Sequence, residues 1–63
     1  MTLTLAEMFD VEICDGHESE RDIYRLADLP TVLRERVLLE RGLEEIHWQS
    51  PDGCKWHLRA AYM

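Results

Sequence analysis

Residues 43–61, LEEIHWQSPDGCKWHLRAA, decide the fold because they carry the pattern of a β-hairpin on either side of a defined turn. The turn is Ser50-Pro51-Asp52-Gly53, in which proline presets φ at the second position and glycine accepts positive φ at the fourth. This combination is typical of a type I turn followed by a left-handed glycine, which makes a three-residue loop with a bulge. The turn therefore predicts a hairpin and fixes which residues face each other across it.

The register set by this loop sorts the hairpin into two unlike faces. Ile46 lies opposite Leu58 and Trp48 opposite Trp56, which makes one face apolar. The other face pairs polar residues: Gln49 with Lys55, His47 with His57, and Glu45 with Arg59. A two-residue Asp-Gly loop would mix the two faces, so the hydrophobic pattern favours the longer loop. One face should cover a core and the other should meet solvent.

A further strand is predicted over about residues 9–14, where apolar and polar residues alternate and Asp15-Gly16 closes the segment. The residues before it fit a short helical turn over residues 5–8, because the Thr-x-x-Glu pattern at residues 4–7 resembles a capping box. For residues 4–13 the sequence therefore fits either a helix or a strand. The strand would pair with the hairpin and direct Asp10 and Glu12 outward.

Two helices are predicted between this strand and the hairpin. The first has Ser19 as a candidate N-cap with Asp22 three residues on, and the second is opened by Pro30 and closed by Gly42. The expected fold class is α+β, in a single domain of residues 1–63. It combines a small three-stranded antiparallel sheet (strand about 9–14 plus hairpin 43–61) with two helices (about 19–29 and 30–41) on one face.

Size and composition limit the possible functions. A 63-residue chain forms one domain that buries only about 60% of its unfolded surface, and the 46% apolar content indicates that it folds. No apolar run reaches the roughly 18 residues of a membrane span, and the N-terminus lacks a secretory pattern. We therefore expect a cytoplasmic monomer with no membrane partner. A chain this short has little room for a shielded catalytic pocket, so no enzymatic activity is expected.

The negative charge is concentrated in the first 28 residues. The chain holds 13 acidic and 7 basic side chains, a net charge of −6. Up to Asp28, eight carboxylates stand against Arg21 and Arg25, whereas acids and bases balance from Leu29 onward. Such a surface attracts cationic partners, and strongly cationic surfaces in a cytosol are those that bind nucleic acid. The predicted partner-binding residues are Asp10, Glu12, Asp15, Glu18, Glu20, Asp22 and Asp28.

Cysteine and histidine form two weaker patterns. The pair Cys14-x2-His17 and Cys54-x2-His57 supplies four ligands of the kinds zinc prefers, but residues three apart on a strand point to opposite faces. His47 opposite His57 fits a two-histidine site or a patch that titrates near neutral pH, with no third ligand evident. No metal and no cofactor is therefore predicted. Whether the cysteines are free, bridged or metal-bound is left open.

In size, acidic charge and hairpin-plus-helix content over its whole length, the chain resembles the small acidic phage-encoded anti-CRISPR proteins. The resemblance implies an inhibitor that mimics DNA and occupies a basic nucleic-acid-binding groove on a CRISPR effector such as the Cascade surveillance complex. It also implies action in the host cytoplasm on a protein partner, without direct binding of nucleic acid. The acidic set from Asp10 to Asp28 would then take the place of phosphates.

Two other functions fit parts of the sequence. Residues 5–9, LAEMF, are similar to the opening of a helix-turn-helix, and two helices followed by a hairpin are typical of a winged-helix DNA-binding regulator. The second predicted helix offers only Arg34, Arg36 and Arg41 among acids, whereas DNA-binding domains usually present a basic stripe. An antitoxin-like subunit that buries apolar surface against a partner chain is the other alternative.

Overall fold

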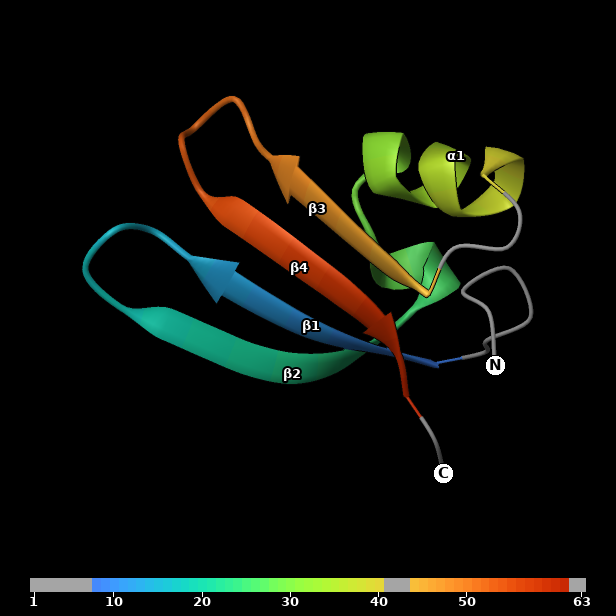
Figure 1. The fold of residues 1–63 in the computed structure, drawn as a ribbon, viewed down its shortest axis with the longest axis horizontal. Coiled ribbons are helices and arrows are strands. Elements are labelled where there is room, and N and C mark those ends of the chain that lie inside the picture. The colour runs from blue at the N-terminus through green and yellow to red at the C-terminus, as the bar shows by residue number, and fades with distance from the viewer. Residues whose placement is uncertain (1–7, 41–43, 62–63) are drawn as a thin grey trace.

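The computed structural model describes residues 8–40 and 44–61. In this part of the chain, four strands form one antiparallel sheet in the order β2-β1-β4-β3, with a helix against it (Figure 1). The elements are β1 (Met8–Cys14), β2 (Ser19–Arg25), a 3-10 turn (Leu26–Asp28), α1 (Thr31–Leu39), β3 (Glu45–Gln49) and β4 (Lys55–Ala60). Two sequential hairpins are thus joined through their central strands, β1 and β4.

The β3–β4 hairpin has the predicted register. Ile46 pairs with Leu58, and Trp48 pairs with Trp56. In the loop, the Gly53 amide donates to the Ser50 carbonyl oxygen at 2.9 Å, and Gly53 has a φ of +92°. The prediction of a loop closed by a left-handed glycine is therefore confirmed.

The predicted helix over residues 19–29 is wrong. Ser19–Arg25 is strand β2, which pairs along its whole length with β1, and only the short 3-10 turn follows it. Ser19 caps no helix, because it lies opposite Cys14 at the start of the ladder. The chain reverses direction between β1 and β2 at Gly16, whose φ is +98°. Backbone pairing of residues 19–25 with β1 outweighs their weak helical pattern of apolar residues. The described fold therefore has four strands and one α-helix instead of three strands and two helices.

Helix α1 occupies the centre of the second predicted helix, over residues 30–41. It begins after Pro30, whose carbonyl oxygen accepts the Arg34 amide at 3.0 Å. Leu33 and Val37 lie one turn apart and are buried. Gly42, predicted to end this helix, lies outside the described residues, as do residues 5–7 of the predicted helical turn, whereas residue 8 belongs to β1. No helix in the described ranges is long and apolar enough to cross a membrane.

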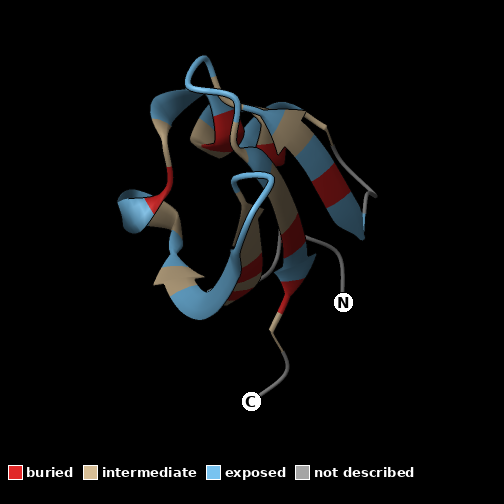
Figure 2. Cartoon of the chain, turned by 90° about the vertical axis from the view of Figure 1, so that its left-hand side faces the viewer, coloured by how far each residue is buried: buried red, intermediate tan, exposed pale blue. Residues whose placement is uncertain are grey.

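The hydrophobic core lies between α1 and the sheet, where buried segments of helix and strands come together (Figure 2). Its members are Phe9, Val11, Leu29, Leu33, Val37, Ile46, Leu58 and Ala60, each at most 7% exposed. Burial of side chains of this kind contributes about 1.5–3 kcal/mol each for the larger ones. The two tryptophans, Trp48 and Trp56, lie on the hairpin face that was expected to cover a core; they are half-buried and pack against this cluster.

The helix covers only part of one sheet face. Both hairpin loops lie at the end of the sheet away from α1 (Figure 1). Glu20 and Asp22 share the helix-side face with the residues they pair with, Ile13 and Val11, yet both acids are exposed. The helix-side face therefore has a covered region that forms the core and an open region bordered by β2.

Candidate functional site

The seven predicted partner-binding carboxylates do not form one surface. Two lie on the outer face of β1, two on the helix-side face of β2, and three in turns. These are, respectively, Asp10 and Glu12, Glu20 and Asp22, and Asp15, Glu18 and Asp28. Neighbouring side chains on a strand point to opposite faces, so residues that are close in sequence are separated by the sheet.

Two of the seven are paired with arginines. Arg21 Nη2 donates to Asp10 Oδ2 at 2.6 Å, and Arg25 Nε donates to Asp28 Oδ2 at 3.2 Å. The hydrogen bond from Arg21 to Asp10 and the charge of that carboxylate raise the pKa of Arg21, so the guanidinium group stays charged. A close pair of opposite charges has a weak field at a distance. Asp10 and Asp28 therefore add little to the negative potential of the domain.

Four carboxylates lie in the turn and the second strand of the β1–β2 hairpin, and we call them the acidic hairpin surface: Asp15, Glu18, Glu20 and Asp22. All four residues are exposed, and no ion pair to any of them occurs within residues 8–40 and 44–61. Strand geometry places Glu20 and Asp22 about 7 Å apart on one face of β2. Because β2 is an edge strand, this surface lies at the margin of the sheet.

Backbone amides fix the charge of the carboxylate in the turn. The amides of His17 and Glu18 both donate to Asp15 Oδ1 at 2.8 Å. The hydrogen bond from Glu18, followed by that from His17, lowers the pKa of Asp15 below its ordinary value. Asp15 is therefore negatively charged at neutral pH and is held in one orientation.

A hollow of about 220 Å³ lies beside the acidic hairpin surface. Its lining residues are Val11, Ile13, Glu20, Arg21, Asp22 and Tyr24. Tyr24 meets Trp56 edge to face with ring centroids 6.1 Å apart, and Trp56 lies 6.0 Å from Trp48. All three rings are half-buried. Of these rings, Tyr24 lines the hollow together with Glu20 and Asp22, and an aromatic ring beside carboxylates suits a side chain with an apolar stem and a cationic head.

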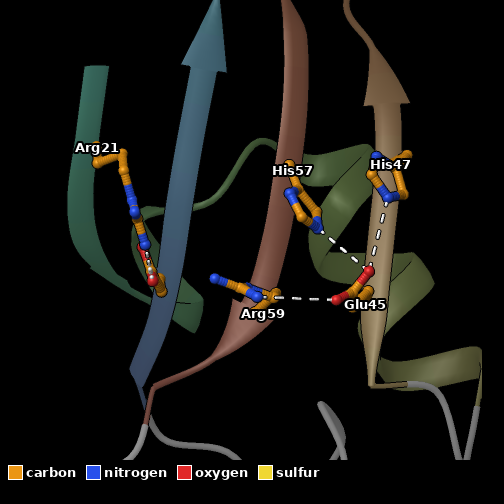
Figure 3. Close-up of polar contacts among 6 residues, drawn as sticks. Arg21, Glu45, His47, His57 and Arg59 are labelled. Carbon is orange, nitrogen blue, oxygen red and sulfur yellow. Dashed lines mark hydrogen bonds and ion pairs between the residues drawn. The ribbon is translucent and has the colours of Figure 1, made fainter. Parts of the chain in front are cut away.

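A second cluster lies on the outer face of the β3–β4 hairpin, on the side of the sheet away from α1 (Figure 3). Glu45 Oε2 is 3.3 Å from His57 Nε2 and 3.8 Å from His47 Nε2, and Glu45 Oε1 is 4.0 Å from Arg59 Nη1. The two imidazoles stack with their centroids 4.1 Å apart and 13° between their planes. Within the described residues, the buried Nε2 atom of His57 has no hydrogen-bond partner.

Glu45, His47 and His57 are the set of side chains in the described ranges whose geometry could hold a metal ion. One donor atom from each lies within 4.8 Å of the others. The sequence had identified both histidines but no third ligand. The signal was present, because residues 45 and 47 are two apart on a strand and so share the face that carries His57.

The cysteines take no part in such a cluster. Both Cys14 and Cys54 are free thiols, and the four-ligand Cys–His arrangement does not appear among the described residues. Partial desolvation and then the charge of Asp52 raise the pKa of Cys54. Cys54 is therefore protonated at neutral pH, which makes it a poor nucleophile and a poor metal ligand without further change.

The chain thus offers two candidate sites, the acidic hairpin surface and the cluster of Glu45, His47 and His57. No protein-family model, curated protein or solved structure matches the chain. The charge of the first site and the ligand geometry of the second are therefore the features that indicate function.

Proposed function

We propose that the chain is an inhibitor that places its acidic hairpin surface on a basic, nucleic-acid-binding surface of a protein partner. The observation that carries this proposal is the group of four exposed carboxylates without ion pairs in the described part of the chain. Like charges repel and lower the stability of a small domain, and a cationic partner would relieve that repulsion. In line with the resemblance to anti-CRISPR proteins, a CRISPR effector such as Cascade is the first partner to test.

The spacing of charges on β2 supports mimicry of a nucleic-acid strand. Glu20 and Asp22 lie on one face of an extended strand, about 7 Å apart. One strand of DNA carries a charge for about every 3.4 Å of helix axis. Because the strand winds around that axis, neighbouring phosphates lie farther apart than this, at a distance comparable with that between the two carboxylates. Lysines and arginines arranged along a nucleic-acid-binding groove could therefore contact these carboxylates at a spacing similar to that of phosphates. Electrostatic steering of this kind mainly accelerates association.

The lining of the neighbouring hollow favours a protein as the binding partner instead of a small ion. Ile13 and Tyr24 supply apolar and aromatic surface, and Glu20 and Asp22 supply charge at the same place. An arginine of the partner could lay its stem on the apolar lining and reach a carboxylate with its guanidinium group. The proposed contact is therefore one anchored cation surrounded by weaker charge pairs.

The proposed site is smaller than the seven residues expected from the sequence. Asp10 and Asp28 already have arginine partners, and Glu12 lies on the opposite face of the sheet from Glu20 and Asp22. We assign the main contribution to the acidic hairpin surface. Of the other three carboxylates, Glu12 contributes to the general negative potential, and Asp10 and Asp28 add little to it.

A charge-reversal experiment tests the assignment. Replacing Glu20→Lys together with Asp22→Lys should lower the potency of the chain at least about tenfold when it competes with target DNA for purified Cascade. The matched control is Glu35→Lys with Glu44→Lys, which changes the net charge equally at exposed positions outside the hairpin. This control should stay close to the wild type.

Three outcomes would contradict the proposal. The first is an equal effect of the two double variants, with near-ultraviolet circular dichroism of the tryptophans showing that both are folded. The second is a shift of random duplex DNA by the chain alone, which would favour the winged-helix alternative. The third is an obligate oligomer in size-exclusion chromatography together with no effect on Cascade, which would favour the antitoxin-like subunit.

A further inference from the structure

The geometry points to a second, independent site: Glu45, His47 and His57 bind one divalent transition-metal ion, with Zn²⁺ as the first ion to test. The site is created by the register of the β3–β4 hairpin. His47 and His57 face each other across the strands, and Glu45 precedes His47 by two residues on the same face. Figure 3 shows the three side chains converging from β3 and β4 on the outer face of the sheet.

The distances agree with shared ligation of one ion. Zinc binds imidazole nitrogen at about 2.0–2.1 Å and carboxylate oxygen at about 2.0–2.2 Å, which puts two ligands of a tetrahedral ion about 3.3–3.5 Å apart. Glu45 Oε2 lies 3.3 Å from His57 Nε2 and 3.8 Å from His47 Nε2. The donor atoms of all three residues lie within 4.8 Å of one another. Small rotations of two exposed side chains, Glu45 and His47, would close the remaining gap.

The surroundings of His57 Nε2 also suit a metal ion. Its Nε2 atom is buried and has no hydrogen-bond partner in the described ranges, although a carboxylate oxygen lies 3.3 Å away. A carboxylate only accepts hydrogen bonds, and so does an imidazole nitrogen that carries no proton. An ion bound through two unprotonated imidazole nitrogens and the carboxylate would be shared by all three acceptors.

The donor set selects the class of ion. Two imidazoles and one carboxylate suit first-row ions such as Zn²⁺, Ni²⁺ and Cu²⁺, whereas Ca²⁺ and Mg²⁺ prefer all-oxygen sites. Three protein ligands leave at least one coordination position for water or for a group from another molecule. We assign binding only, with no reaction at the ion.

The surroundings of the cluster limit its affinity. Arg59 Nη1 lies 4.0 Å from Glu45 Oε1, where it helps to orient the carboxylate and leaves Oε2 facing the histidines. Its positive charge also opposes a second cation nearby. Glu12 lies opposite His57 in the β1–β4 ladder and supplies a compensating negative charge on the same face. Because His47 and Glu45 are exposed, we expect micromolar binding instead of the tighter binding of a buried structural zinc site.

The test uses the full chain without an affinity tag, titrated with ZnCl₂ at about pH 7.5. Calorimetry should give one ion per chain. Nuclear magnetic resonance of the imidazole groups should show that Zn²⁺ moves the signals of His47 and His57. The signals of His17, exposed in the β1–β2 turn, should stay in place and serve as an internal control. Mg²⁺ should move none of them.

Variants separate the cluster from other ligands in the chain. His47→Ala and His57→Ala should each weaken Zn²⁺ binding at least about tenfold. His17→Ala and the double variant Cys14→Ser with Cys54→Ser should bind as the wild type does. Absence of binding heat, equal signal changes at His17, or loss of binding in the cysteine variant would overturn the proposal. The signal pattern in the wild-type chain decides the question even if a histidine variant fails to fold.

Discussion

The two hairpins of this domain use their faces differently. The β3–β4 hairpin has one face in the core, through Ile46 and Leu58, and presents histidines and charges on the other. In the β1–β2 hairpin, β1 buries Phe9 and Val11, whereas every residue of β2 except Tyr24 is exposed. An edge strand can therefore belong to the sheet through backbone pairing and a well-formed turn. Its side chains are then free to carry charge.

The largest difference between the hairpins should appear in the free energy of unfolding, when a buried side chain is removed from one hairpin and an exposed side chain from the other. Leu58→Ala on β4 deletes a fully buried side chain from the strand that joins the two hairpins. The expected loss is about 2–5 kcal/mol in the free energy of unfolding. That loss is a large part of the roughly 3–9 kcal/mol available to a domain of this size. Urea denaturation followed by tryptophan fluorescence measures it.

Ile23→Ala on β2 is the matched control for this change. Ile23 is 47% exposed on the outer face, so its removal should alter the free energy of unfolding by no more than about 0.5 kcal/mol. If both variants lost the same stability, the division into a buried hairpin and a charged edge strand would be incorrect.

An intermediate effect is expected at the two hairpin turns, where the hairpins should behave alike. Gly16 and Gly53 have φ of +98° and +92°, and a Cβ at either position would meet no atom within 4 Å. Replacement of each by alanine should therefore cost about 1–2 kcal/mol through backbone conformation alone. Urea midpoints of Gly16→Ala and Gly53→Ala measure the two costs. Unchanged stability in Gly16→Ala would contradict the turn between β1 and β2.

The same contrast explains which parts of the fold were predictable. Residues 45–49 and 55–60 alternate between polar and apolar on either side of the loop that contains Pro-Asp-Gly, so their register followed from the sequence. Strand β2 has no such alternation, because its side chains lack an apolar face to bury, and Ser19 with Asp22 imitated a helix start. An edge strand that is held by backbone pairing and buries no apolar face therefore leaves no strand pattern in its own sequence.

The candidate sites follow the same division. The facing histidines were predicted because the hairpin register was correct. Glu45 was missed because it pairs with Arg59, lies on the same strand as His47 and meets His57 only diagonally. The acidic set was predicted from its density along the sequence. Density cannot assign side chains to faces, and the error at β2 prevented that assignment. Only part of the set, the acidic hairpin surface, is exposed and has no ion pair within the described residues.

The smallest effect on stability is expected at acid pH. It comes from Asp15 and Asp52, each of which directly precedes the glycine of its hairpin turn. The Ser50 hydroxyl, followed by the Cys54 amide at 3.1 Å, lowers the pKa of Asp52, as the Glu18 and His17 amides lower the pKa of Asp15. Groups with a lowered pKa in the folded state stabilise it above their ordinary value of 3.8. This contribution disappears as the pH falls through the lowered folded values.

Asp15→Asn and Asp52→Asn should therefore each reduce the loss of stability on acidification by a similar small amount. Urea midpoints at about pH 6 and about pH 2.5 give the comparison. Both carboxylates are exposed, so the changes should be smaller than those of the glycine variants. If Asp52→Asn flattened the pH profile and Asp15→Asn left it unchanged, the two turns would not be equivalent.

The dependence of Cascade binding on salt tests the role of the acidic hairpin surface most directly. The wild-type chain is compared with Glu20→Gln plus Asp22→Asn, which keeps the shape of β2 and removes two charges. Between about 50 and about 500 mM NaCl the screening length falls from more than about 10 Å to about 4 Å. The wild-type affinity should fall at least about tenfold over this range, and the affinity of the neutralised variant should fall clearly less. Identical salt dependence for the two proteins, or none for the wild type, would contradict the proposed function.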